Sequence, residues 1–317
     1  MMRIFYSPLH NRHNPTQEIY DGVPAPYAEV PGRVEAIADR LRTGNIELET
    51  PSQFGLEPIQ AVHQQQYIDF VRTRSEQLAA DDILFPSYFM NDTYAPLTRG
   101  TYSAALGAVD TALSGAQAIV GGKRVAYSLC RPPGHHAGYN RMGGYCYFNN
   151  AAIAAEYLAA RGRVAILDID YHHGNGTQEM FYDRDDVLYV SLHADPGVAY
   201  PYASGFAAEV GRGKGQGFTR NFPLPKATTG DEYIETLQAA LGVIAKFQPD
   251  FLLVSVGFDT HQADPIAGLA LRQEDYHDIA EHIVAAELPT LLIQEGGYNV
   301  ELLPELASTF LQPFRKL

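Results

Sequence analysis

Short apolar runs alternate with helical patterns along almost the whole chain, and this alternation constrains the fold more than any other feature. The runs that read as strands are Arg3–Tyr6, Arg124–Leu129, Val164–Asp170, Val187–His193, Phe251–Val256 and Thr290–Gln294. The helical patterns are Gly32–Arg42, Tyr67–Gln77, Thr98–Val120, Asn149–Ala160, Asp231–Lys246, Gln273–Glu287 and Glu301–Phe310. Such alternation predicts parallel strands with helices on both faces. We therefore expect an α/β chain in which residues 1–317 form a single three-layer α/β/α domain around a mainly parallel sheet.

Composition places the chain among globular enzymes and excludes several other classes. Hydrophobic residues make up 46% and charged residues 19% of the chain, and the formal net charge is −14. That charge disfavours nucleic acid as a partner and mildly favours a cationic ligand. Because no apolar run could span a bilayer and no signal-peptide pattern is present, we expect no membrane partner and a cytoplasmic location. We read Cys130 and Cys146, which lie in apolar stretches, as reduced.

Three segments lack periodic apolar positions: His10–Pro31, Asp81–Pro96 and Asp195–Gly217. They are rich in Gly, Pro, Tyr and charged residues. Long loops on a regular sheet usually form the functional rim. Their composition alone does not say which substrate they surround.

The stretch Asp168–Gly176 contains several residues that could bind a metal ion. It reads Asp-Ile-Asp-Tyr-His-His-Gly-Asn-Gly and directly follows the apolar run Arg163–Leu167. If the strand continues, its alternation points Asp168, Asp170 and His172 the same way. Two carboxylates and an imidazole at the carboxyl end of a strand predict a metal site, because ligands bind at that edge of parallel sheets.

Other reactive groups also follow predicted strands and should meet at the same edge: Arg131–Ala137, Gly257–His261 and Glu295–Asn299. Asp170 and His172, joined by Asp259, would form a site of one nitrogen and two carboxylates. Three protein ligands leave one position open, as in catalytic zinc sites. Taken singly, either aspartate could equally cap a strand end; together they favour the metal. Iron(II) or cobalt(II) would accept the same ligands.

The remaining groups suit acid–base chemistry beside that metal. Asp168 could orient His135 or His172 by accepting a ring N–H. The tandem His135–His136 can supply a general base and a general acid, since imidazole titrates near neutral pH. Tyr298, after a double glycine, is placed to donate its phenolic proton to an oxyanion. A tyrosine in that position is equally often a packing residue.

These residues stand in motifs that resemble those of the zinc-dependent deacetylases of the arginase–deacetylase fold, which include histone deacetylases and acetylpolyamine amidohydrolases. The matching motifs span about half of the chain and are Arg131–Ala137, Gly143–Asn150, Asp168–Gly176, Ser191–His193, Asp264–Pro265 and Glu295–Tyr298.

The resemblance implies roles for particular residues. It implies one zinc ion per chain, held by Asp170, His172 and Asp259. It makes His136 the general base and acid, gives His135 an electrostatic role tied to Asp168, and makes Tyr298 the clamp on the substrate carbonyl. It also implies a structural potassium ion with ligands from Asp168, Asp170, His172, Ser191 and Leu192. In this chain Asn175 replaces an aspartate of some relatives, so His136 should gain less proton affinity from it.

The binuclear manganese ureohydrolases share the fold but need further carboxylates. This chain has Gly174 and His261 at the two positions concerned. A two-metal guanidine hydrolase is therefore disfavoured, and we expect hydrolysis of an N-acyl amine, most often an acetyl group, at one metal.

The substrate is less constrained than the chemistry. The resemblance implies that Gly144, Tyr145 and Tyr200 wall a tunnel for a slim aliphatic amine. Glu18 matches an acidic residue at the tunnel mouth of amidohydrolases and could bind a distal ammonium, or be a solvated loop carboxylate. Asp92 resembles a rim aspartate that contacts substrate in protein deacetylases.

We therefore expect a deacylase for acetylpolyamines or similar small cationic N-acyl amines. The alternatives are an acetyl-lysine protein deacetylase and, in a different class, a catalytically silent protein that binds acylated amines. The resemblance implies that polyamine enzymes of this family narrow the entrance by dimerising through a longer insertion. Asp81–Pro96 is shorter than that insertion, which weakens both the polyamine assignment and the expectation of a homo-oligomer.

Overall fold

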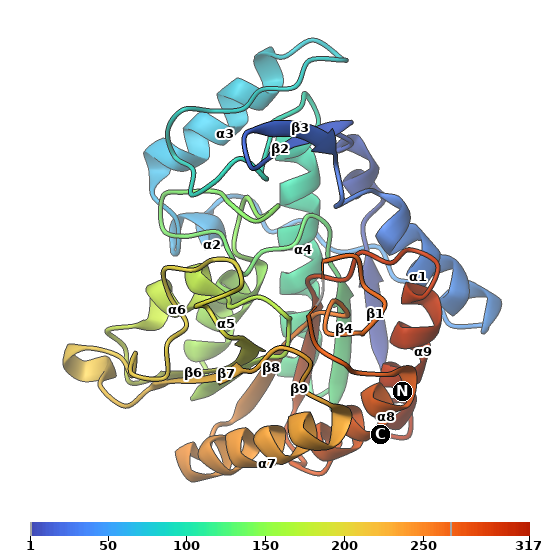
Figure 1. Ribbon diagram of the computed structural model, residues 1–317, viewed down its shortest axis with the longest axis vertical. Helices are drawn as coiled ribbons and strands as arrows, with labels where there is room; N and C mark the ends of the chain where they lie inside the picture. The colour runs from blue at the N-terminus through green and yellow to red at the C-terminus, as the bar shows by residue number, and fades with distance from the viewer. Residues whose placement is uncertain (1, 267) are drawn as a thin grey trace.

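The computed structural model describes residues 2–266 and 268–317, and its centre is a seven-stranded sheet (Figure 1). The strand order is β1-β4-β9-β8-β5-β6-β7, and every neighbouring pair is parallel. The strands are β1 (Arg3–Tyr6), β4 (Val125–Leu129), β5 (Val164–Asp168), β6 (Val187–Ala194), β7 (Thr219–Leu224), β8 (Phe251–Val256) and β9 (Thr290–Gln294).

Helices cover both faces of this sheet, which confirms the predicted α/β/α layers. On one face of the sheet, a layer of helices shares a hydrophobic core with the strands. This layer contains α1 (Gly32–Thr43), α7 (Gly230–Phe247), α8 (Gln273–Val284) and α9 (Leu303–Phe314). The opposite layer contains α3 (Gln65–Gln77), α4 (Thr101–Val120) and α5 (Asn150–Ala159). Strands β4, β5, β6 and β9 are buried at every residue, as strands covered on both faces must be.

All the predicted strands and long helices are present, but β5 ends at Asp168, two residues earlier than predicted. Asp170 and His172 therefore lie beyond the strand, and strand alternation does not orient them. Their side chains still meet: Nδ1 of His172 lies 3.3 Å from Oδ1 of Asp170, which also accepts from the backbone N–H of His172 at 2.8 Å. The expected convergence is correct, but the predicted reason for it is wrong.

Several elements escaped prediction. The edge strand β7 has the sequence TRNFPL, whose partly exposed residues weaken its apolar signal. A hairpin of β2 (Gln17–Tyr20) and β3 (Val23–Pro26) lies within the irregular segment His10–Pro31. Asp21 and Gly22 both have positive φ between its strands, so Asp-Gly was a turn signal that could have revealed it. The short helices not predicted are η1 (Pro8–Arg12), α2 (Glu57–Gln60), α6 (Asn175–Phe181) and η2 (Gly213–Gly215).

The topology gathers the reactive segments. Strands β4, β9, β8 and β5 are consecutive neighbours in the sheet, and each of the predicted site segments follows one of them. Residues as far apart in sequence as Arg131 and Tyr298 thus reach the same edge. In the described part of the chain, no helix combines the length and the apolar character that crossing a bilayer requires.

A buried histidine links the loops beneath this edge. His63 follows α2; its Nε2 accepts from the backbone N–H of Asn149 at 2.9 Å, and its Nδ1 lies 3.0 Å from the carbonyl oxygen of Gly138. Burial lowers the pKa of His63 to about 4. An unfolded histidine has a pKa near 6.5, so protonation favours the unfolded chain as the pH falls from about 6.5 towards 4.

We therefore expect the free energy of unfolding to drop between pH 7 and pH 5 by about 2 kcal/mol more in the wild type than in His63→Gln. Urea unfolding at the two pH values measures this difference. Gln53→Ala, which changes an exposed residue without a titratable side chain, is the control and should keep the wild-type pH dependence. Equal pH dependence in His63→Gln and the wild type would contradict the assignment.

Candidate active site

Three predicted metal ligands lie together at the carboxyl edge of the sheet. Asp170, His172 and Asp259 are all buried, and each offers a ligand atom within 4.8 Å of the others. Asp170 and His172 follow β5, while Asp259 follows the neighbouring strand β8. Nδ1 of His172 lies 3.1 Å from Oδ2 of Asp259. The structure thus brings together His172 and Asp259, which are 87 positions apart in the sequence.

The donor set fits a divalent cation. Burial, together with the negative charge of Asp170, raises the pKa of Asp259. Two buried carboxylates repel one another, and a cation between them would relieve that repulsion. Gly257 and Gly296 leave the necessary room, because a Cβ on either would overlap a carboxylate of the cluster. Carboxylate oxygens and imidazole nitrogen are ligands that zinc and related metals accept.

His135 lies behind the cluster and contacts Asp168. Its Nδ1 is 3.1 Å from Oδ2 of Asp168, which also accepts from the hydroxyl of Tyr189 at 3.1 Å. Burial alone would lower the pKa of His135, but the carboxylates of Asp170 and Asp168 raise it to about 10. His135 is therefore suited to carry a positive charge. Of the two partners that the sequence allowed for Asp168, the structure shows His135.

His136 has a different environment. Its Nδ1 lies 2.8 Å from Oδ1 of Asn175. Burial and the positive charges of His135 and His172 lower the pKa of His136 well below its usual value. The Asn175 oxygen accepts a hydrogen bond from the N–H at Nδ1, so Nε2 keeps its lone pair. His136 is therefore suited to accept a proton.

Tyr298 lies at the end of the loop that follows β9. Asp264 fixes this loop: its carboxylate accepts hydrogen bonds from the backbone N–H groups of Tyr298 at 2.6 Å and Asn299 at 3.2 Å. The guanidinium of Arg33 lies over the Tyr298 ring, 4.7 Å from its centroid. Burial raises the pKa of Tyr298 well above its usual value, so its hydroxyl keeps its proton.

Arg33 belongs to a charged network that the sequence did not reveal. Glu29 is fully buried, and its Oε1 accepts from Arg33 at 2.5 Å and from Arg131 at 2.8 Å. Arg33 also donates to the backbone carbonyls of Glu295 and Gly297. Arg33 stands in a predicted helix, where an arginine is normally exposed, so no local signal marked it.

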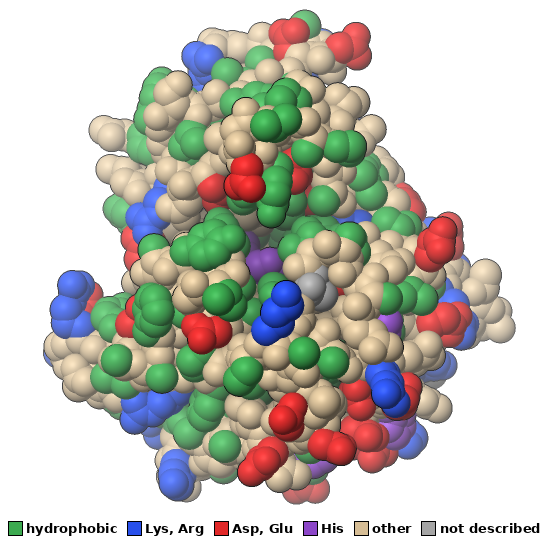
Figure 2. Space-filling model, in the orientation of Figure 1, with side chains coloured by type: hydrophobic (Ala, Val, Ile, Leu, Met, Phe, Trp, Pro, Cys, Tyr) green, Lys and Arg blue, Asp and Glu red, His purple; other side chains and the backbone are tan. Residues whose placement is uncertain are grey.

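A cavity of about 430 Å³ opens onto these groups. In Figure 2 a hollow on the visible face has histidine at its base and hydrophobic side chains around it. The residues that line it include several predicted site residues: Glu18, His136, Gly144, Tyr145, His172, Tyr200 and Tyr298. Glu18 is 4% exposed and accepts from the hydroxyl of Tyr145 at 3.3 Å. Glu18 is therefore a buried carboxylate in the cavity wall, not a solvated loop residue.

The other predicted residues lie close by. Ser191 of β6 is in register with Asp168 of β5, and Leu192 follows it, so the residues expected to bind potassium are neighbours. Asp92 is not among the residues that line the cavity. Its carboxylate accepts from Tyr200 at 2.6 Å and from the Gly144 N–H at 3.0 Å. Contact between Asp92 and a substrate stays a prediction.

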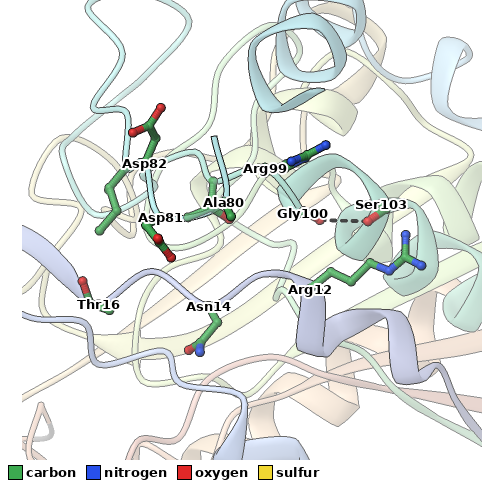
Figure 3. A pocket seen from close by; sticks show the side chains of 11 residues that line it. Arg12, Asn14, Thr16, Ala80, Asp81, Asp82, Arg99, Gly100 and Ser103 are labelled. Atoms are coloured by element: carbon green, nitrogen blue, oxygen red, sulfur yellow. Dashed lines mark hydrogen bonds between the residues drawn. The ribbon is translucent and has the colours of Figure 1, made fainter. Parts of the chain in front are cut away.

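A larger cavity, of about 720 Å³, lies beside the start of α4 and holds none of the predicted site residues (Figure 3). Exposed side chains of both charges line it, among them Arg12, Arg99, Asp81 and Asp82. A second group that could hold a cation lies on α8: His277, Asp278 and Glu281, which are half-buried or exposed. Neither place combines burial with an open cavity, as the cluster around Asp170 does.

Known proteins resemble the chain along its whole length. The histone deacetylase domain model matches residues 27–313. Acetylpolyamine amidohydrolase 2 of Pseudomonas aeruginosa is 41% identical over 99% of this chain and 98% of that protein. The acetylpolyamine amidohydrolase of Mycoplana ramosa is 38% identical over 94% and 95%. A crystal structure of acetylpolyamine aminohydrolase from Burkholderia pseudomallei superposes with a TM-score of 0.94 at 36% identity, covering 99% and 98% of the two chains. The chain therefore belongs to the histone deacetylase family of deacetylase and amidohydrolase enzymes.

Proposed function

We propose that the protein hydrolyses acetylpolyamines, or similar small cationic N-acyl amines, to acetate and a free amine. The observation that carries this proposal is the cavity, in which the buried carboxylate of Glu18 shares one space with His136, His172 and Tyr298. A cationic amine end could meet Glu18 while its acetylated end meets the reactive groups. The names of the full-length relatives support the same substrate class.

Asp170, His172 and Asp259 would hold the metal ion, which we propose is zinc. When bound, zinc supplies Lewis-acid chemistry: it polarises an amide carbonyl and lowers the pKa of a water molecule. We also propose that potassium, held near Asp168 and Ser191, supports the loop after β5. The adjacent register of these two residues favours such a site.

His136 and His135 divide the proton chemistry. Nε2 of His136 accepts the proton of the attacking water, because its Nδ1 is occupied by Asn175. His136 then returns that proton to the departing amine nitrogen. His135, charged through its contacts with Asp168 and Asp170, stabilises the negative charge that develops nearby. Because Asn175 is neutral, His136 releases its proton readily.

Tyr298 stabilises the carbonyl oxygen of the substrate. Its protonated hydroxyl donates a hydrogen bond as that oxygen gains negative charge. Tyr145, whose ring centroid lies 5.5 Å from that of Tyr298, and Tyr200, whose ring lies 4.9 Å from that of His136, wall the cavity. Their rings would bury the methylene groups of a slim amine. The cytoplasmic location, the absence of a nucleic-acid partner and the oligomeric state stay predictions.

Removal of one metal ligand should abolish metal binding. After dialysis, we expect Asp170→Ala to contain about one tenth of the zinc of the wild type, because the two remaining ligands bind zinc weakly. Elemental analysis of the dialysed protein measures this, and Glu281→Ala on α8 is the control that should keep its metal. Equal zinc in Asp170→Ala and the wild type would place the ion elsewhere.

Loss of the Tyr298 hydroxyl should slow the chemical step. We expect Tyr298→Phe to lower kcat about 100- to 1000-fold, as when one oxyanion donor is removed, with little change in KM. Steady-state kinetics with acetylputrescine test this. Tyr88→Phe alters an exposed tyrosine outside the cavity and should leave kcat unchanged. Full activity of Tyr298→Phe would refute the mechanism.

Glu18 should select charged amines. We expect Glu18→Gln to raise KM for acetylputrescine about 10- to 100-fold, the value of a hydrogen bond to a charged group, and to spare neutral N-acetylbutylamine. Steady-state kinetics of the wild type and of Glu18→Gln with acetylputrescine, acetylspermidine and acetyl-lysine peptides decide the substrate class. If peptides react best and Glu18→Gln changes nothing, the protein is an acetyl-lysine deacetylase instead.

A further inference from the structure

Asp92 holds two walls of the cavity together without lining the cavity itself. Oδ2 of its carboxylate accepts from the Tyr200 hydroxyl at 2.6 Å, and both oxygens accept from the Gly144 N–H at 3.0 and 3.2 Å. Oδ1 also accepts from the N–H of Tyr94 at 2.8 Å. Three segments that are distant in sequence thus share one carboxylate.

Both cavity walls that Asp92 holds pack against His136. The Tyr200 ring meets the His136 ring edge to face, with centroids 4.9 Å apart and an interplanar angle of 83°. Gly144 lies so close to the imidazole that a Cβ there would overlap its Cδ2 and Cγ atoms. The position of the proposed base and the width of the cavity beside it therefore depend on the same two contacts.

The Asp92 side chain is half-buried, and its carboxylate is held by hydrogen bonds from the protein. Three protein donors contact its oxygens, two on each oxygen because the Gly144 N–H is shared, and a Cβ on Gly143 would lie 2.5 Å from Oδ2. A carboxylate with these contacts has little capacity left for a substrate N–H. It is well placed to fix its neighbours, since hydrogen bonds to a carboxylate are short and strong.

We propose that Asp92 is a positioning residue that sets the width of the substrate cavity: it anchors Tyr200 and Gly144 on either side of His136 and so selects unbranched amines. This inference rests on the proposed function, because it concerns the amine that the cavity admits. Without the Asp92 carboxylate, the Tyr200 ring is free to turn away from His136 and the cavity widens.

The test compares Asp92→Ala, Tyr200→Phe and the double variant. The substrates are two N-acetyl amines with the same number of carbons, one linear and one with a methyl branch on its chain. We expect each single variant to lower the ratio of kcat/KM for the linear over the branched substrate about tenfold, the usual cost of one misplaced methylene group. The double variant should resemble the more affected single variant, because both changes break one contact. Asp81→Ala, in the same loop but exposed, is the control.

The alternative role gives a different result. If Asp92 bound the substrate directly, Asp92→Ala would raise KM, Tyr200→Phe would leave the linear-to-branched ratio unchanged, and the two effects would add. That outcome overturns the proposal. Tyr200→Phe keeps the ring and removes one oxygen, so it tests the contact even if Asp92→Ala does not fold.

A crystal structure of the Asp92→Ala protein separates this proposal from the proposed function. We expect the Tyr200 ring to move away from His136, beyond the 4.9 Å centroid separation of the wild type. An unmoved ring overturns the positioning role, whatever the activity. A wild-type protein without deacetylase activity would refute the proposed function, while the crystal comparison would still decide the role of Asp92.

Discussion

The cost of burying two carboxylates beside each other governs the organisation of this protein. Asp170 and Asp259 are buried at the carboxyl edge of the sheet, with the His172 imidazole as their shared neighbour. Negative charges that are removed from water need a partner, and a divalent cation is the strongest partner available. Glycine at positions 257 and 296 gives these carboxylates their room, since a Cβ on Gly257 or Gly296 would overlap a carboxylate oxygen. Metal binding and folding of these loops should therefore be coupled.

A second buried charge cluster holds the loop Glu295–Asn299, which follows β9, in place. Glu29 binds Arg33 and Arg131 with the same oxygen, and Arg33 reaches the carbonyls on both sides of the Glu295–Gly297 turn. Removing one member of such a cluster leaves an uncompensated buried charge, which strongly destabilises the folded protein. Arg33 also lies over the ring of Tyr298. The N-terminal segment, although remote from the metal ligands in sequence, thus helps to determine where the phenol lies.

The sequence predicted the parts of this structure that follow from periodicity, and it missed those that follow from long-range pairing. The strands β4, β5, β6, β8 and β9 were identifiable because they are short and mainly apolar, and their parallel order brought Asp170 and Asp259 together. The edge strand β7 was not, since its half-exposed residues carry no clear pattern. The partners of Glu29 were also beyond reach: no local feature distinguishes Arg33 from an exposed helical arginine. Glu18 was left open between a ligand and a solvated carboxylate, and its burial depends on Tyr145 and Ala28, which only the fold brings near it.

The turn at Gly144 and Tyr145 places one wall of the cavity through an unusual backbone conformation. Both residues have positive φ, at 51° and 68°, a conformation that costs a tyrosine free energy and persists only where its surroundings enforce it. Here the Asp92 carboxylate binds the Gly144 N–H, and Glu18 accepts the hydrogen bond of the Tyr145 hydroxyl. The same two acidic residues that hold the turn thus place one aromatic wall of the cavity. Because Asp92 also binds Tyr200, the opposite wall is fixed to the same loop, and the two walls cannot adjust independently. A narrow, rigid cavity is the expected consequence, and such a cavity suits a slim amine better than a bulky one.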